Sequence, residues 1–182
     1  RVFVGQQIGV SDAYISAAVH SSVSGEVTDV KPMLYPGGFE IMCVEIKPDG
    51  LQEVHESVKP PAFTDNEGII KALKDAGLVG LGGAGFPTAV KLSPPPEAKL
   101  DTLVVNGAEC EPYITSDYRE MMENPKGILE GTKAVMKITG IKKAYIGIES
   151  NKPRAIMLLD EMAKDYEGIE VVPLRTRYPQ GG

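Results

Sequence analysis

The chain has 182 residues, of which 42% are hydrophobic, so it is long and apolar enough to bury a substantial core in one or two domains. A formal net charge of −6, no tryptophan and 6% aromatic residues give no basis for nucleic-acid binding. No run of 18 apolar residues occurs, so no direct membrane span is expected.

Residues 1–58 are predicted to form β structure. The strand-like segments alternate in hydrophobicity or are rich in β-branched residues, and turn clusters such as HSSVSG and YPGG separate them. These segments are residues 1–4, 14–19, 25–30 and 39–46. Short strands at such close spacing are typical of a small barrel or sandwich.

Residues 59–182 are predicted to form an α/β domain. A helical stripe over residues 67–76 follows a possible cap at Thr64 or Asp65, and a second, short helix starts near Pro87. Beyond it, apolar strands alternate with helical patterns; the strands are residues 100–106, 142–149 and 169–174, and the helices are residues 117–137 and 152–166. This alternation predicts a parallel sheet with right-handed crossovers.

The stretch GLVGLGGAGFPTAVKL, residues 77–92, holds five glycines. Gly80, Gly82 and Gly85 have the spacing GxGxxG, but a helix rather than a strand precedes them, which argues against an ordinary Rossmann fingerprint. No Gly-Lys-Ser/Thr follows, so a Walker loop is excluded. Such a loop can offer backbone N–H groups to an anion or let a flat ring lie on bare backbone. The alternative is a tight packing corner between elements.

A second motif, VVNGAECEPYITSDYRE, spans residues 104–120 and follows a predicted buried strand. It therefore belongs to the carboxyl edge of the sheet, where ligands bind in open α/β folds. Its amide and carboxylates, on Asn106, Glu109 and Glu111, can hydrogen-bond a polar heterocycle or a ribose. The alternative is an acidic loop that only caps the next helix.

Three motifs in this order, GLGGAGFPTAVKL, NGAECEPYITSDYR and RYPQGG, resemble the RnfC family of the Rnf complex. That complex is a membrane-bound ferredoxin:NAD+ oxidoreductase that moves Na+ or H+, and the flavin-binding subunit of respiratory complex I has a similar glycine loop. The resemblance implies a lipoyl-like barrel-sandwich hybrid over residues 1–58 and a Rossmann-like, FMN- and NADH-binding α/β domain over residues 59–182. It also implies partner subunits and a peripheral place on the cytoplasmic side of the membrane.

The resemblance assigns FMN contacts to the glycine loop, the lysine behind it and the strand-end loop: Gly80, Gly82, Gly83, Gly85, Lys91, Asn106 and Glu109. A cation at Lys91 would stabilise the negative charge of the reduced flavin; a solvated helix-end lysine is the alternative. NADH contacts are assigned to Phe86 and Glu111, and for Phe86 the alternative is an ordinary core position. No catalytic residue is assigned.

Two positions depart from the complex I pattern. Ala108 stands where that branch has an aspartate, and Ser93 and Pro94 stand where it has a second aromatic residue. The departures affect the NADH contacts more than the FMN contacts. In the β region no lysine lies between Gly9 and Ser16, which argues against a lipoylated or biotinylated arm and favours a docking or structural module.

The family passes electrons from flavin to iron–sulfur clusters, which need several thiolates. This chain has only Cys43 and Cys110, and neither histidine has metal-ligand spacing with them, so the [4Fe-4S] clusters are expected outside this segment and no metal ligand is assigned. Strand-like residues at the start and a turn signal at the end make the chain an expected part of a longer protein. Two other functions remain possible: a cobalamin reductase of bacterial microcompartments, which shares these motifs, and a scaffold without its own cofactor.

Overall fold

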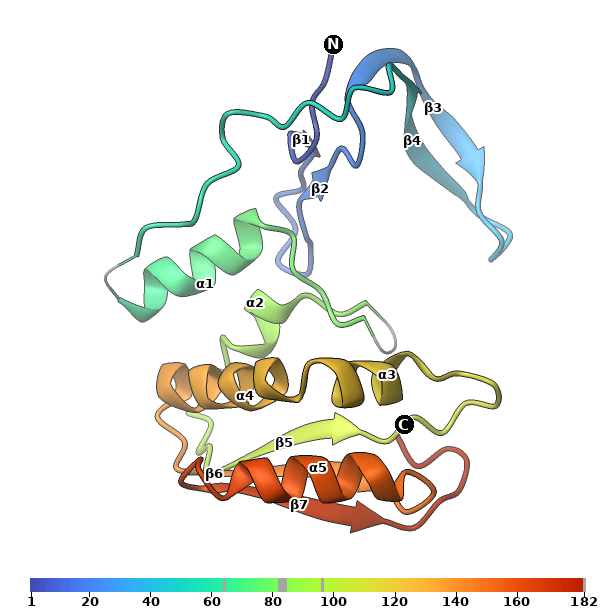
Figure 1. Cartoon of the computed structure of the whole chain (residues 1–182). Helices are drawn as coiled ribbons and strands as arrows, with labels where there is room; N and C mark the ends of the chain where they lie inside the picture. The colour runs from blue at the N-terminus through green and yellow to red at the C-terminus, as the bar shows by residue number, and fades with distance from the viewer. Residues whose placement is uncertain (64, 82–84, 96, 182) are drawn as a thin grey trace. The chain divides into compact units, whose positions relative to one another are not determined.

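The computed structural model describes residues 1–63, 65–81, 85–95 and 97–181. The chain divides into two compact units, Arg1–Ser93 and Pro94–Gly182, each held together by contacts among its own residues (Figure 1). This division falls after the glycine-rich stretch, whereas the sequence motifs favour a domain boundary at residue 58. The boundary at residue 58 stays a prediction.

The first unit begins with two antiparallel strand pairs. Strand β1 (Gln7–Gly9) pairs with β2 (Val19–His20), and β3 (Gly25–Leu34) forms a long hairpin with β4 (Glu40–Pro48). The hairpin matches two of the predicted strands and extends both of them. Its turn carries a ring contact between Tyr35 and Phe39, whose centroids are 5.3 Å apart.

Two predicted strands of this region are wrong as continuous strands. Residues 1–4 form only isolated bridges, from Val2 to Gly25 and from Val4 to Val54. Because the bridging partner changes within two residues, no ladder can propagate. Of residues 14–19, only Val19 belongs to a strand.

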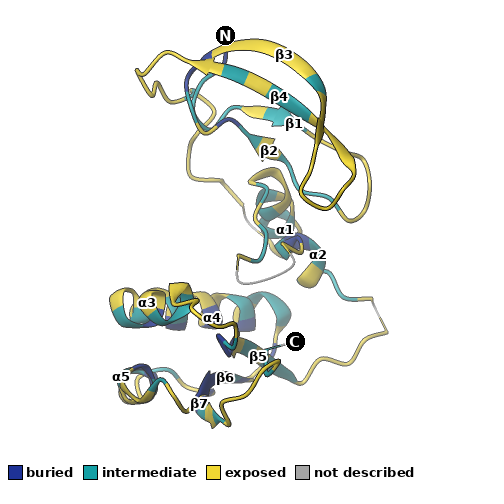
Figure 2. Cartoon of the chain, turned by 90° about the vertical axis from the view of Figure 1, so that its right-hand side faces the viewer, coloured by how far each residue is buried: buried dark blue, intermediate teal, exposed yellow. Residues whose placement is uncertain are grey.

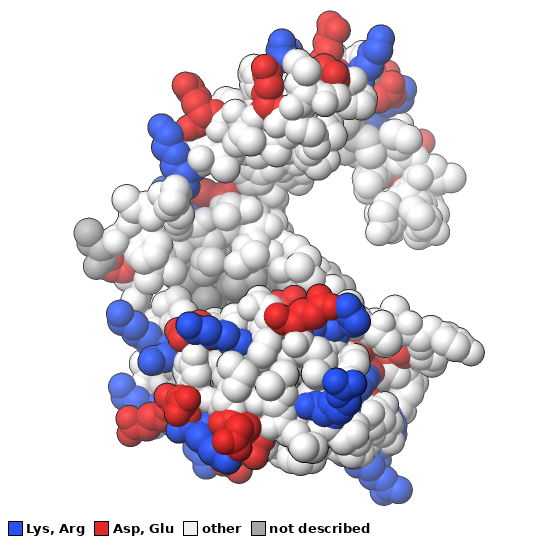
Figure 3. All heavy atoms as spheres, in the orientation of Figure 1, with Lys and Arg blue, Asp and Glu red and all other residues white. Residues whose placement is uncertain are grey.

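The hairpin exposes apolar side chains near its turn. Leu34 is 75% exposed, Met42 69% and Phe39 56%. Figure 3 shows charged side chains along the base of this hairpin and mostly uncharged atoms at its tip.

Two helices complete the first unit. Helix α1 (Asn66–Asp75) starts where the Asp65 carboxylate accepts a hydrogen bond from the Gly68 N–H at 2.8 Å, which confirms one of the two predicted caps. Helix α2 (Thr88–Lys91) is a single turn that follows Pro87, as the sequence predicts.

The second unit has a three-stranded parallel sheet in the order β5-β6-β7, which confirms the predicted topology. Its strands are β5 (Thr102–Gly107), β6 (Lys143–Glu149) and β7 (Ile169–Leu174), and its helices are α3 (Ser116–Glu123), α4 (Pro125–Thr139) and α5 (Pro153–Ala163). The helices pack against one face of the sheet, and the buried residues lie between the two layers (Figure 2). The hydrophobic core includes Leu129 of α4, Ile146 and Ile148 of β6, and Leu159 of α5, none more than 1% exposed.

The prediction of one helix over residues 117–137 is wrong, because the structure has two. Helix α3 ends at Glu123 and α4 begins at Pro125, with Asn124 between them at φ −135° and ψ 47°. A proline disfavours the helical conformation in the residue before it and has no N–H to donate. Asn124 then serves as the cap of α4, since its Oδ1 accepts a hydrogen bond from the Gly127 N–H at 3.2 Å.

Candidate functional site

Two segments of the glycine-rich stretch, residues 78–80 and 86–88, pair with each other. Val79 and Pro87 form an antiparallel bridge, and the Gly80 N–H donates to the Phe86 carbonyl at 3.0 Å. The Thr88 N–H donates to the Leu78 carbonyl at 2.9 Å, so the loop leads directly into α2. Of the predicted FMN contacts, Gly82 and Gly83 lie outside the described residues.

Gly80 and Lys91 lie together at the base of this loop. A Cβ built on Gly80 would lie 2.9 Å from Lys91 Nζ, so the ammonium occupies the space next to bare backbone. This arrangement places a positive charge directly beside bare backbone, and a cation so placed suits a phosphate or a flat polar ring such as that of FMN. A single turn such as α2 has little macrodipole, so the charge at this site comes from Lys91.

Gly85 and Phe86 form the outgoing end of the loop. Gly85 has φ +64°, a conformation that residues with a Cβ rarely adopt, and open space surrounds the position of its absent side chain. Phe86 is 38% exposed, so its ring is not part of a core. An exposed ring next to Gly85 is available to a planar ligand.

In the second unit, Asn106 lies near the end of β5 and ties two loops together. Its Oδ1 accepts a hydrogen bond from the Ala108 N–H at 3.0 Å, and its Nδ2 donates to the Gly181 carbonyl at 2.9 Å. A Cβ built on Gly181 would lie 2.6 Å from the Ala108 carbonyl oxygen, so only glycine fits there without movement. The two loops that carry NGAEC and RYPQGG are therefore joined at this edge of the sheet.

These residues border a groove of about 500 Å³ on the face of the sheet that the helices leave uncovered. Asn106, Gln180 and Gly181 form its rim, and its floor comes from side chains of all three strands, among them Val104, which is 69% exposed. The groove thus joins an apolar floor to polar groups at the carboxyl ends of the strands, where ligands bind in folds of this class.

Glu109 is buried and holds the start of α3. Its Oε1 accepts the Asp117 N–H at 2.8 Å, and its Oε2 accepts from Lys152 Nζ at 3.1 Å. The Glu109 side chain is 2% exposed and that of Lys152 14%, so this is a buried ion pair. Burial and the nearby Glu109 carboxylate raise the pKa of Asp117. The capping role that the sequence left open is therefore present, and a contact from Glu109 to FMN stays a prediction.

Glu111 has the opposite environment. It is exposed, and its backbone carbonyl accepts a hydrogen bond from the Ile114 N–H at 3.3 Å across a tight turn. Within the second unit, Glu109 is therefore buried and hydrogen-bonded, whereas Glu111, two residues further on, is exposed.

Three features of these loops were not predicted from the sequence. Lys152 is 43 residues from its partner Glu109, and no local pattern links them. The bond from Asn106 to Gly181 spans 75 residues. Tyr113 has φ +67°, for which the preceding Pro112 was the only available signal, since proline favours the first corner of a turn.

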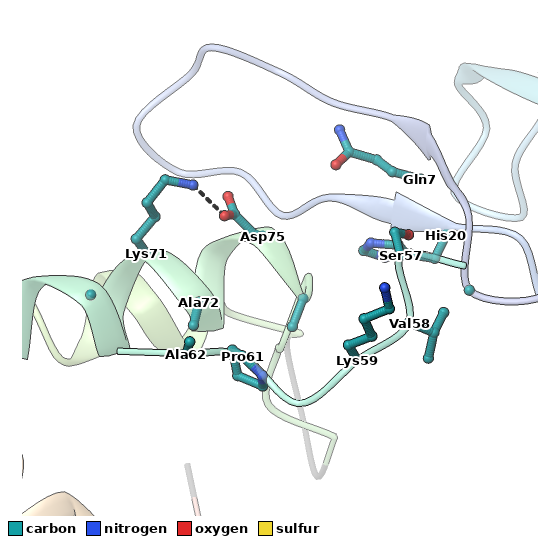
Figure 4. A pocket seen from close by; sticks show the side chains of 13 residues that line it. Gln7, His20, Ser57, Val58, Lys59, Pro61, Ala62, Lys71, Ala72 and Asp75 are labelled. Carbon is teal, nitrogen blue, oxygen red and sulfur yellow. Dashed lines mark hydrogen bonds and ion pairs between the residues drawn. The ribbon is translucent and has the colours of Figure 1, made fainter. Parts of the chain in front are cut away.

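A separate hollow of about 710 Å³ lies in the first unit between the β segments and α1 (Figure 4). Gln7, His20 and Lys59 line it, and the ion pair of Lys71 and Asp75 lies at α1. It contains none of the residues that the sequence motifs single out. In the described part of the chain, no three His, Cys, Asp or Glu side chains are grouped to hold a metal ion.

Two family models match the chain. Residues 73–182 match the Nuo51 FMN-binding domain, and residues 1–51 match the RnfC barrel sandwich hybrid domain. These matches confirm the predicted fold class: a barrel-sandwich hybrid followed by an α/β domain of the complex I flavin-subunit type.

Similar proteins match nearly the whole of this chain. The C subunit of the proton-translocating ferredoxin:NAD(+) oxidoreductase complex of Clostridium ljungdahlii is 44% identical over 97% of this chain and 39% of its own length. The C subunit of the Na(+)-translocating complex of Acetobacterium woodii is 43% identical over 99% of this chain and 41% of its own length. The C subunit of the ion-translocating oxidoreductase complex of Pseudomonas aeruginosa is 40% identical over the whole chain, which spans 24% of that relative.

Solved structures agree with the family models. A chain of an NAD+-reducing NiFe-hydrogenase is 27% identical in its H2-reduced crystal structure, with a TM-score of 0.51 over 63% of this chain and 22% of that one. The air-oxidized state gives a TM-score of 0.50 at the same identity. Because the Nuo51 FMN-binding domain matches more than half of its residues, the chain belongs to that domain family, and its first 51 residues together with its relatives make it similar to RnfC.

Proposed function

We propose that this chain is the FMN- and NAD(H)-handling part of an RnfC protein in an ion-translocating ferredoxin:NAD+ oxidoreductase. The names of its relatives, which are subunits of such complexes, support the proposal. So does the match of residues 73–182 to an FMN-binding domain. The chain spans less than half of those relatives, so activity, substrates and partner subunits are all part of this proposal.

One observation carries the FMN assignment: the Lys91 ammonium lies against the bare backbone of Gly80. In the proposal, Gly80, Gly82 and Gly83 lie along the flavin, Gly85 turns the loop toward α2, and Lys91 places a positive charge beside the isoalloxazine. Bound FMN supplies hydride acceptance and single-electron release. The protein residues bind and orient it.

The strand-end loop carries the other contacts of this proposal. Asn106 and Glu109 contact FMN in this proposal, although both also hold the loop itself. Exposed Glu111 and Phe86 are proposed to contact NADH. Glu111 suits a ribose, because a carboxylate accepts hydrogen bonds from hydroxyl groups.

The remaining assignments concern the whole complex. Electrons pass in this proposal between FMN and [4Fe-4S] clusters that bind outside residues 1–182. Among the helices that the structure describes, none is long and apolar enough to cross a membrane. Attachment to the cytoplasmic side of the membrane through partner subunits is proposed, and the module of residues 1–51 is a candidate for that contact.

FMN titration of the full-length protein, followed by quenching of flavin fluorescence, tests this proposal. Wild type is expected to bind stoichiometrically, and Lys91→Ala and Gly82→Val are expected to weaken binding by at least tenfold, roughly the value of one charge-assisted contact. Lys74→Ala, on exposed α1, is the matched control and should bind as wild type does.

The outcomes separate the proposal from its rivals. If wild type binds no FMN, the scaffold function is favoured and the proposal is wrong. If FMN binds but Lys91→Ala and Gly82→Val bind equally well, the glycine-rich stretch is a packing corner and the flavin lies elsewhere. Preference for cob(III)alamin over NAD+ as the electron acceptor would instead identify the cobalamin reductase branch.

A further inference from the structure

Tyr113 occupies a turn position that normally requires glycine. The Ile114 N–H donates to the Glu111 carbonyl, which closes a four-residue turn with Pro112 at its second position. Tyr113, at the third position, has φ +67°. Proline followed by a positive φ is the pattern of a type II turn, whose third residue is usually Gly or Asn.

Nothing in the described part of the chain offsets this backbone strain. Tyr113 is 102% exposed, so its ring packs against no neighbour that could stabilise the conformation. An aromatic residue at positive φ is rare, and such residues persist where the surrounding structure or a function requires them. A glycine would make the same turn without strain, so the presence of a tyrosine here favours a role for its exposed ring.

The turn is held at a defined place. Its first residue, Glu111, follows Glu109 by two positions, and Glu109 is fixed to α3 and to Lys152. Asn106 fixes the start of the same loop to Gly181. The Tyr113 ring therefore projects from an anchored loop at the carboxyl edge of a parallel sheet, the edge at which such folds bind nucleotides.

We propose that Tyr113 is a binding residue that stacks on a planar ring of NAD(H), beside the ribose contact of Glu111. This inference rests on the proposed function, because it needs NAD(H) at this edge of the sheet. Both the nicotinamide and the adenine offer the same stacking chemistry, since each presents a π-face to an aromatic side chain.

The test compares three variants of the full-length protein in its purified complex. Tyr113→Phe keeps the ring, Tyr113→Asn keeps a side chain that tolerates positive φ but removes the ring, and Tyr113→Gly also relieves the strain. NADH affinity, measured by titration, should fall about tenfold in the Asn and Gly variants and stay within about twofold in the Phe variant. ADP-ribose, which lacks nicotinamide, identifies the ring: its affinity falls in parallel if adenine stacks and is unchanged if nicotinamide does.

Thermal unfolding shows whether a variant binds NADH more weakly only because its fold is less stable. Tyr113→Gly should unfold at the same temperature as wild type or a higher one, because it removes strain and no packing. Weaker NADH binding in a variant that is equally stable cannot then be ascribed to unfolding.

NADH affinity in the Asn and Gly variants equal to that of wild type would overturn the inference. If a partner protein is lost from the complex at the same time, Tyr113 is a protein-docking residue instead. Failure of the proposed function is distinct from this result, because only then does wild type itself fail to bind NADH.

Discussion

The carboxylate of Glu109 connects residues that are distant in the chain. It accepts hydrogen bonds from the backbone at the start of α3 and from Lys152, which lies just before α5. Removing one partner of a buried pair leaves the other charge without compensation, which costs about 3–5 kcal/mol. We therefore expect Glu109→Ala to lower the free energy of unfolding by about 3 kcal/mol in urea denaturation.

Two further variants make this prediction specific. Glu111→Ala, at an exposed position two residues away, should change the free energy of unfolding by less than about 0.5 kcal/mol. Adding Lys152→Met to Glu109→Ala should recover part of the loss, because the uncompensated ammonium is removed. Equal effects of Glu109→Ala and Glu111→Ala would contradict the structural role of the ion pair.

At the residue scale, the sequence identified the chemical groups but not their environments. Glu109 and Glu111 look equivalent in NGAECEPY, yet one is buried and the other exposed. The difference depends on Lys152, a contact over 43 residues that no local pattern encodes. Tyr113 was missed for a similar reason, since a positive φ follows from how the whole loop closes.

At the scale of single elements, α4 offers two glycines with opposite expectations. Gly131 lies within the helix and Gly140 follows it at φ +74°, and at both positions an added Cβ would meet nothing within 4 Å. Alanine therefore changes only the backbone preference. Gly131→Ala should raise the free energy of unfolding by about 0.5–1 kcal/mol, whereas Gly140→Ala should lower it by about 1 kcal/mol.

Thermal denaturation of the two variants checks this pair of predictions. Both variants add the same methyl group to the same helix. Changes of opposite sign in their stability therefore report the left-handed backbone conformation of Gly140. A shift of the same sign in both variants would mean that α4 does not end at Gly140 as the structure shows.

The helices and strands also show which sequence patterns were sufficient to predict secondary structure. Continuous apolar runs predicted β5, β6 and β7: one set of their side chains packs under the helices, and the alternate set forms the apolar floor of the groove on the uncovered face. The break between α3 and α4 was available from the Asn124–Pro125 dipeptide but was overridden by the helical periodicity around it. Residues 1–4 have strand composition without a strand, because their bridging partners lie in separate segments that only the folded chain brings near.

At the scale of the whole molecule, the core lies in one of the two units. Every residue of the hydrophobic core cluster belongs to 94–182, whereas the buried apolar side chains described in 1–93 are those of Val2, Pro87 and Ala89. Buried apolar area is the main source of folding free energy. Amide hydrogen exchange should therefore be slowest in β6 and α5 and much faster in the β3–β4 hairpin.

A core substitution tests whether the two units have separate stabilities. Leu159, in α5, is fully buried, so Leu159→Ala should cost about 2–5 kcal/mol and speed exchange throughout β5, β6 and β7. The amides of β3 and β4 should keep their wild-type rates, because none of their side chains belongs to that core. Met157→Ala, on the same helix but 71% exposed, is the control and should leave both sets unchanged. If Leu159→Ala speeds exchange equally in the hairpin and in the sheet, the chain unfolds as one cooperative body, and the stability of the glycine-rich loop then depends on the core of the second unit.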